Sequence, residues 1–176
     1  SPYRLWAGAV LSHPFAYAAH RLAHFNVNTR FLVHDEIERP VTDQSPPNDW
    51  NYRITHNPAQ RLIDRLAVWS GSTPLGWPIC WLALALGVLI VSPDLPSRRL
   101  VVPIALSTFL YGLAYLPLSV AAELRYHLWT MLGTAVATAI AASEVTHVPA
   151  RRLAIAAAPL ALVILLCTIW RLFPAL

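Results

Sequence analysis

The residues best suited to chemistry lie in Leu118–Trp129, LSVAAELRYHLW, where Glu123, Arg125, Tyr126 and His127 occur within five positions between two apolar runs. Arginine offers a planar fork that fits phosphate, and tyrosine places an amphipathic ring at the depth of lipid headgroups. Histidine or glutamate can transfer protons or bind sugar hydroxyls. Charged groups are costly inside a bilayer. The pattern therefore predicts a binding site for an anionic lipid phosphate at a helix end.

A plainer interpretation of this segment is favoured on the residues alone. Arginine and tyrosine are ordinary anchors at the ends of membrane helices. In that case Glu123 simply pairs with Arg125, and the segment is a turn between two helices.

Two other groups of residues are of types that bind metal or haem. His20 and His24 are four residues apart and could share a metal ion, but no third ligand is fixed by spacing. Haem would need histidine pairs inside apolar runs, whereas His127 and His147 lie at helix ends. We therefore predict no metal site and no cofactor. Cys80 and Cys167 both lie in apolar runs and are interpreted as small buried side chains.

The composition indicates a membrane protein. Of the 176 residues, 56% are hydrophobic and 12% are charged, against about 25% charged in soluble domains. All thirteen basic residues other than histidine are arginine, and they are scattered, many at the ends of apolar runs. Nucleic acid is not an expected partner, because its binding would require a clustered basic surface.

The first part of the chain, residues 1–74, is predicted to be a juxtamembrane segment. In His13–Phe25, with Pro14 in the first turn, the histidines fall opposite an apolar face, which indicates a helix lying in the membrane interface. His34–Asn57 is polar and rich in proline, and is predicted to be an aqueous loop. Pro58–Ser70 is a second amphipathic helix, broken by Gly71–Pro74.

The second part, residues 75–176, is predicted to be a bundle of about four transmembrane helices. The runs are Leu75–Ser92, Leu100 to about Ala122, about Arg125–Ser143, and Leu153–Phe173, each close to the roughly 20 residues that a span requires. Small residues recur every four positions in the third run, so we expect it to be the most surrounded by protein. The bulkier fourth run should face more lipid. The predicted fold is an all-α integral membrane protein.

The orientation follows from the positive-inside rule. Two short loops, Pro93–Arg99 and Glu144–Arg152, each end in an arginine pair and are assigned to the cytoplasm. Four further arginines lie on the opposite side, so only the density of charge in the short loops favours this orientation. It places residues 1–74 and the Glu123–His127 segment together on the outer face.

The chain also resembles a known family. The similarity lies in three features in chain order: His13-Pro14-Phe15-Ala16-Tyr17 with His20-Arg21-Leu22, then a polar outer segment, then apolar helices with Ala122-Glu123-Leu124-Arg125-Tyr126. In these features the chain is similar to the carboxy-terminal half of bacterial multi-spanning GT-C glycosyltransferases of the dolichyl-phosphate-mannose–protein mannosyltransferase type. The resemblance implies an inner-membrane, multi-pass enzyme that transfers sugar from a polyprenyl-phosphate donor.

That family carries its catalytic carboxylates in a first outer loop, to which no position here corresponds. Asp35, Glu36 and Glu38 are acidic neighbours on the same side but do not match that motif. We therefore expect a missing amino-terminal part of the same protein to supply catalysis. Arg125 would contact the donor phosphate, with Glu123, Tyr126 and His127 beside it. The alternative is a non-enzymatic membrane scaffold or assembly partner, supported by the small residues of the third run.

Overall fold

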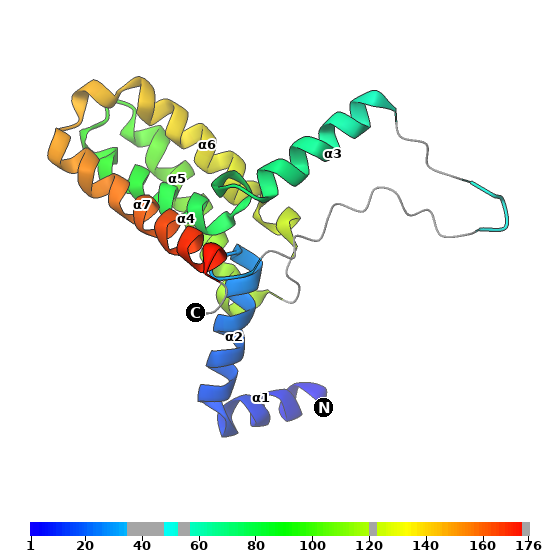
Figure 1. The fold of residues 1–176 in the computed structure, drawn as a ribbon. Coiled ribbons are helices and arrows are strands. Elements are labelled where there is room, and N and C mark those ends of the chain that lie inside the picture. Colours follow the sequence, from blue (N-terminus) through cyan, green and yellow to red (C-terminus); the bar gives the residue numbers. More distant parts are fainter. Residues whose placement is uncertain (35–47, 53–56, 120–122, 174–176) are drawn as a thin grey trace.

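A computed structural model describes residues 1–34, 48–52, 57–119 and 123–173. Within these ranges every regular element is an α-helix or a short 3₁₀ turn, and none is a strand. Figure 1 shows a bundle of helices with the two amino-terminal helices and a third helix extending away from it. The expectation of an all-helical chain is confirmed. Asp35, Glu36, Glu38 and most of the predicted polar loop lie outside the described residues.

Two helices open the chain, α1 (Pro2–Ser12) and α2 (Pro14–Thr29), and each has proline in its first turn. Proline is tolerated there because its missing N–H would have no partner in the helix. The predicted helix His13–Phe25 is therefore confirmed, and it continues to Thr29. It ends at Arg30, which adopts the left-handed conformation with φ 54°.

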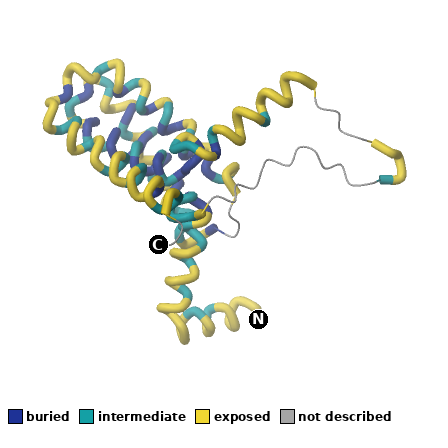
Figure 2. The backbone as a smooth tube through the Cα atoms, viewed as in Figure 1, coloured by how far each residue is buried: buried dark blue, intermediate teal, exposed yellow. Residues whose placement is uncertain are grey.

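Helix α3 (Pro58–Gly71) begins with a capping box in which Asn57 Oδ1 accepts from Gln60 N–H and Gln60 Oε1 accepts from Asn57 N–H. These bonds satisfy donors that a helix start otherwise leaves free. The helix ends at Gly71, in agreement with the predicted break. It projects from the bundle, and its side chains are largely exposed, including the apolar Leu62 and Trp69 (Figures 1 and 2).

The bundle consists of four helices that follow the short turn η1 (Pro74–Gly76) and are joined by three more short turns. In chain order these elements are α4 (Pro78–Val91), η2 (Ser92–Asp94), α5 (Arg98–Leu118), η3 (Leu124–His127), α6 (Leu128–Ser143), η4 (Val145–His147) and α7 (Ala150–Leu172).

Helix α4 is the centre of the bundle, because it packs against α5, α6 and α7. Eight of its fourteen residues are buried, against five of sixteen in α6 and one in α7. The prediction that the third apolar run is the most enclosed is wrong. The small residues of α6 do face protein, but α4 also has small side chains and occupies the middle position. Helix α7 is the most exposed of the four, as expected.

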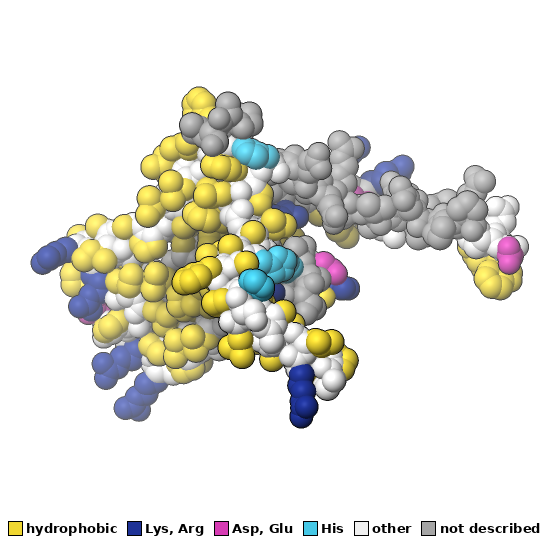
Figure 3. Space-filling model, turned by 90° about the horizontal axis from the view of Figure 1, so that it is seen from below, with side chains coloured by type: hydrophobic (Ala, Val, Ile, Leu, Met, Phe, Trp, Pro, Cys, Tyr) yellow, Lys and Arg dark blue, Asp and Glu magenta, His cyan; other side chains and the backbone are white. Residues whose placement is uncertain are grey.

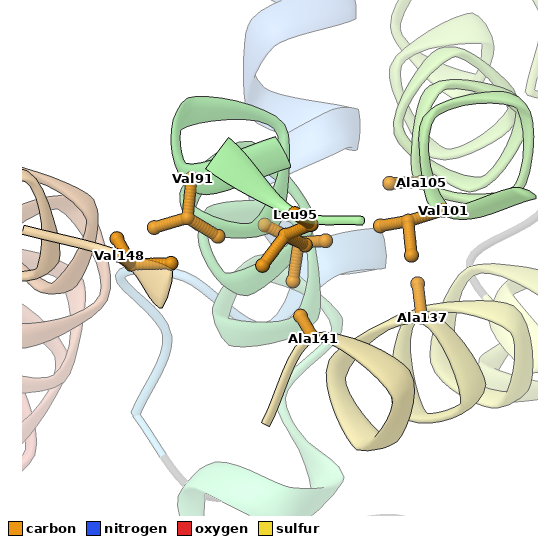
Figure 4. Packing of buried hydrophobic residues seen from close by; sticks show 8 residues of the cluster. Val91, Leu95, Val101, Ala105, Ala137, Ala141 and Val148 are labelled. Atoms are coloured by element: carbon orange, nitrogen blue, oxygen red, sulfur yellow. The ribbon is translucent and has the colours of Figure 1, made fainter. Parts of the chain in front are cut away.

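Two apolar clusters hold the bundle together. The larger lies at the end nearest η2 and η4 and joins all four helices (Figure 4). Its buried members are Val88, Val91, Leu95, Val101, Ala105, Ala137, Ala141 and Val148. The smaller cluster contains Trp77, Cys80 and Cys167 and joins the start of α4 to the last turns of α7. Both cysteines are unpaired and buried, so they act as small apolar side chains, as predicted.

Helices α5 and α7, with 21 and 23 residues, are long and apolar enough to cross a membrane. Helices α4 and α6 have 14 and 16 residues, below the roughly 20 that a full span requires. Proline at the first turn of α4 and the short turn η3 before α6 shorten these helices relative to their apolar runs. The four predicted spans therefore appear as two long helices and two shorter ones.

Candidate functional site

The four predicted site residues lie on a short turn rather than on a long helix. Helix α5 ends at Leu118, just after Pro117, and the turn η3 (Leu124–His127) leads directly into α6 at Leu128. Glu123 is the extended residue that precedes η3. The third apolar run thus begins three residues later as a helix than the sequence predicted, and Arg125, Tyr126 and His127 belong to its entry turn.

Glu123 and Arg125 form an ion pair on the surface, between the glutamate Oε2 and the arginine Nε. Their side chains are 45% and 73% exposed, and an ion pair this exposed adds about 0–1 kcal/mol to stability. The Arg125 guanidinium also lies over the Tyr126 ring, with Cζ 5.5 Å from its centroid. Hydrogen bonding to Tyr126, and then the charge of Glu123, raises the pKa of Arg125, so the guanidinium remains charged. The turn presents a positive, planar group held by an aromatic ring and a carboxylate.

Tyr115 of α5 joins this turn to the bundle, although the sequence did not single it out. Its ring centroid lies 5.9 Å from that of Tyr126 and 4.9 Å from that of His127. Its hydroxyl donates to the Tyr111 hydroxyl at 2.8 Å. Tyr111 and Tyr115 are spaced one helical turn apart near the end of an apolar helix, and that spacing is the signal that could have identified them.

His127 does not share the exposed surface of Arg125. Its side chain is fully buried, and neither ring nitrogen has a hydrogen-bond partner among the residues that the structure describes. Burial lowers the pKa of His127 to about 4, so the imidazole is neutral at pH 7. The structure thus brings Glu123, Arg125 and Tyr126 together at the surface, with His127 beneath them against Tyr115.

Arg21 of α2 fixes the same corner of the molecule, although from the sequence it entered only the family motif and had no role at this site. Its guanidinium donates to three carbonyl oxygens at the end of α5, those of Tyr115 at 3.1 Å, Leu116 at 2.8 Å and Ser119 at 2.7 Å. Carbonyls in the last turn of a helix lack partners within the helix, and a positive charge there is favourable.

Asn28, two turns further along α2, adds a fourth contact through its Nδ2, which donates to Ser119 Oγ at 3.2 Å. The inward stripe of α2 is therefore polar, whereas Phe15 and Leu22 are exposed. Arg21 and Asn28 together place α2 beside the end of α5 that leads to η3.

The histidine pair on α2 flanks Arg21. The ring centroids of His20 and His24 are 6.3 Å apart, and no group of three or more potential metal ligands occurs in the described part of the chain. Burial, followed by the charges of Arg21 and His20, lowers the pKa of His24.

The far end of the bundle carries the two predicted cytoplasmic loops. Ser97 donates through its N–H and Oγ to Glu144 Oε2 at 3.1 and 2.8 Å, which ties the loop before α5 to the end of α6. Arg152 Nη1 lies 2.6 Å from Asp94 Oδ1 and joins the same two loops. Both arginine pairs therefore lie at the end of the bundle opposite η3 (Figure 1). No family model, curated protein or solved structure matched the chain in comparisons with known proteins.

Proposed function

We propose that this chain is the carboxy-terminal membrane region of a glycosyltransferase that uses a polyprenyl-phosphate-linked sugar, with its catalytic carboxylates upstream. The observation that carries the proposal is the exposed Arg125 guanidinium, paired with Glu123 and lying over the Tyr126 ring. The family resemblance of the α2 and η3 motifs supplies the reaction class. In this proposal Arg125 binds the donor phosphate and the turn does not catalyse transfer itself.

The proposal includes four membrane crossings by α4, α5, α6 and α7. Support comes from the exposure of the apolar helices, because only 22% and 11% of the apolar windows of α5 and α7 are buried inside the protein. Apolar side chains cover much of the surface shown in Figure 3. Large apolar surfaces of this kind belong against lipid or a partner. The shorter α4 and α6 would cross where the bilayer thins locally, at modest energetic cost.

The orientation in this proposal places the arginine pairs of both short loops in the cytoplasm and η3 on the outer face. Helices α1, α2 and α3 then lie near the outer headgroups. The exposed apolar residues of α3, such as Leu62 and Trp69, would insert into the interface, while Arg61 and Arg65 remain among the headgroups.

Phosphate recognition follows from the chemistry of the turn. Guanidinium and phosphate form short, paired, charge-assisted hydrogen bonds. The Tyr126 ring restricts the arginine to one side, and Glu123 holds it through Nε, so less rotational freedom is lost on binding. An incoming phosphate would compete with the exposed carboxylate of Glu123, which contributes little to stability and is readily displaced.

The experiment compares Arg125→Ala, Arg125→Lys and the control Arg4→Ala in the full-length enzyme, with sugar transfer and thermal stability both measured. Loss of a charge-assisted contact of about 1.5–3 kcal/mol should reduce transfer by Arg125→Ala about 10- to 100-fold without lowering stability. Arg125→Lys should restore only part of the activity, because lysine lacks the planar fork. Arg4, which is exposed on α1, should be replaceable without effect. Full activity of a folded Arg125→Ala enzyme would contradict the proposal.

The packing of α6 removes one of the arguments for the scaffold alternative. The small residues of α6 that suggested a surface for a partner are used inside this chain. A Cβ atom at Gly133 would lie 2.3 Å from Thr108 Cγ2, and Ala137 and Ala141 are buried in the larger apolar cluster. Sequencing upstream of Ser1 separates the two functions, because paired carboxylates after a first spanning helix favour the transferase and a short soluble leader favours the scaffold.

A further inference from the structure

A groove runs along the outside of the bundle between α6 and α7, with α4 as its floor. It has a volume of about 240 Å³ and is open to the surface. Its walls are almost entirely aliphatic, with Leu84 and Val88 on α4, Ala142 on α6, and Ala157 and Leu160 on α7. An apolar groove of this kind gives ordered water few hydrogen-bond partners.

Small residues create the groove. A Cβ atom at Gly87 would lie 2.5 Å from the Ala156 carbonyl oxygen, so the backbones of α4 and α7 are in direct contact. Helix α6 packs against α4 and α5 instead. The alanine side chains that α6 and α7 turn toward each other, including Ala142 and Ala157, are too short to fill the space between the two helices.

One end of the groove reaches the arginine-rich loops. Val91, Val145 and Val148 line it there: Val91 precedes η2, Val145 begins η4, and Val148 follows η4. The two loops carry four arginines and two carboxylates. Each carboxylate already has a partner within the protein, Asp94 with Arg152, and Glu144 with Ser97. This end of the bundle is therefore net positive and attracts anionic headgroups near the membrane surface.

We propose that the groove binds one acyl chain of an anionic diacyl phospholipid, whose phosphate lies among the arginines of the two loops. The groove is smaller than the roughly 300–1,000 Å³ pockets of drug-sized ligands, and its aliphatic walls match a linear hydrocarbon. The positive charge at one end of the groove favours lipids with anionic headgroups. This site lies at the opposite end of the bundle from Arg125 and requires membrane embedding but no transfer activity.

Native mass spectrometry of the detergent-solubilised full chain tests this site with phosphatidylglycerol and phosphatidylcholine as probes. Ala157→Phe would fill the groove, and Ala158→Phe is its matched control, because Ala158 is the neighbouring exposed alanine of α7 and does not line the groove. We expect Ala157→Phe to reduce retained phosphatidylglycerol at least about tenfold and Ala158→Phe to retain it.

The headgroup is tested separately with the double variant Arg98→Gln and Arg151→Gln, which removes the excess positive charge of the two loops. We expect this variant to lose the preference of the wild-type chain for phosphatidylglycerol over phosphatidylcholine while it still retains lipid. Equal retention of phosphatidylglycerol by the Ala157 and Ala158 variants would overturn the proposal. Loss of self-association in Ala157→Phe, with lipid retention unchanged, would show that the groove holds a second copy of the chain instead.

Discussion

Acidification should destabilise this protein through His127, and replacement by leucine should remove the effect. The unfolded histidine has a pKa of about 6.5, whereas burial lowers that of the folded protein to about 4. Between these values the unfolded chain binds more protons than the folded one, so stability falls as the pH falls. A separation of about 2.5 pKa units corresponds to about 3 kcal/mol, of which about 2 kcal/mol should be lost between pH 7 and pH 5.

The leucine variant should also be at least as stable as the wild-type chain at pH 7. Both ring nitrogens of His127 are buried without a hydrogen-bond partner in the described structure, and an apolar side chain of similar size removes that cost of about 1–3 kcal/mol. The assay is thermal unfolding in detergent micelles at pH 7, 6 and 5. His13→Leu, which replaces an exposed histidine just before α2, is the control and should keep the wild-type pH dependence. A parallel fall in stability for the wild-type and His127→Leu chains would refute this assignment.

Two further outcomes concern packing. Arg21→Met should free α2 from the end of α5, because it removes three hydrogen bonds and lowers stability by about 2–4 kcal/mol. Arg21→Lys should restore little of that stability. The measurement is amide exchange in α2, which should become faster, and unchanged protection would contradict the anchoring role of Arg21. Gly133→Ala should lower stability by about 1–3 kcal/mol, because the added methyl group would meet the β-branched Thr108 at 2.3 Å. Exposed Ala139→Val is its control, and equal melting temperatures for the two variants would count against close packing of α5 and α6.

Local features of the chain could be predicted from the sequence because they depend on neighbouring residues. Pro14 identified the start of α2, and Gly71 marked the end of α3. The apolar runs gave the order of the bundle helices. In each case the signal is a proline, a glycine or a hydrophobic period that acts within a few positions.

Features that depend on distant contacts were not predictable in this way. The pattern of α2 predicted an interfacial helix and no partner in the bundle, yet Arg21 meets α5 carbonyls more than ninety positions away. His127 lies two positions from the exposed Arg125 but points into the bundle, because the turn η3 directs adjacent side chains to different sides. Helix α4 likewise occupies the centre because it packs against three other helices, and the hydrophobic pattern within one helix does not reveal how many neighbours it has.

The last turn of α7 carries a further consequence for the end of α2. Arg171 donates to the carbonyl oxygens of Arg30 and Phe31 at 2.9 and 3.1 Å, and its guanidinium lies 4.0 Å from the centroid of the Trp77 ring. A residue of the last bundle helix therefore fixes the end of α2 and the start of α4. Without Arg171, the residues after α2 lack these bonds. Chains truncated before Arg171 should thus expose the residues after α2 to proteases, so that packing of α7 protects the end of α2.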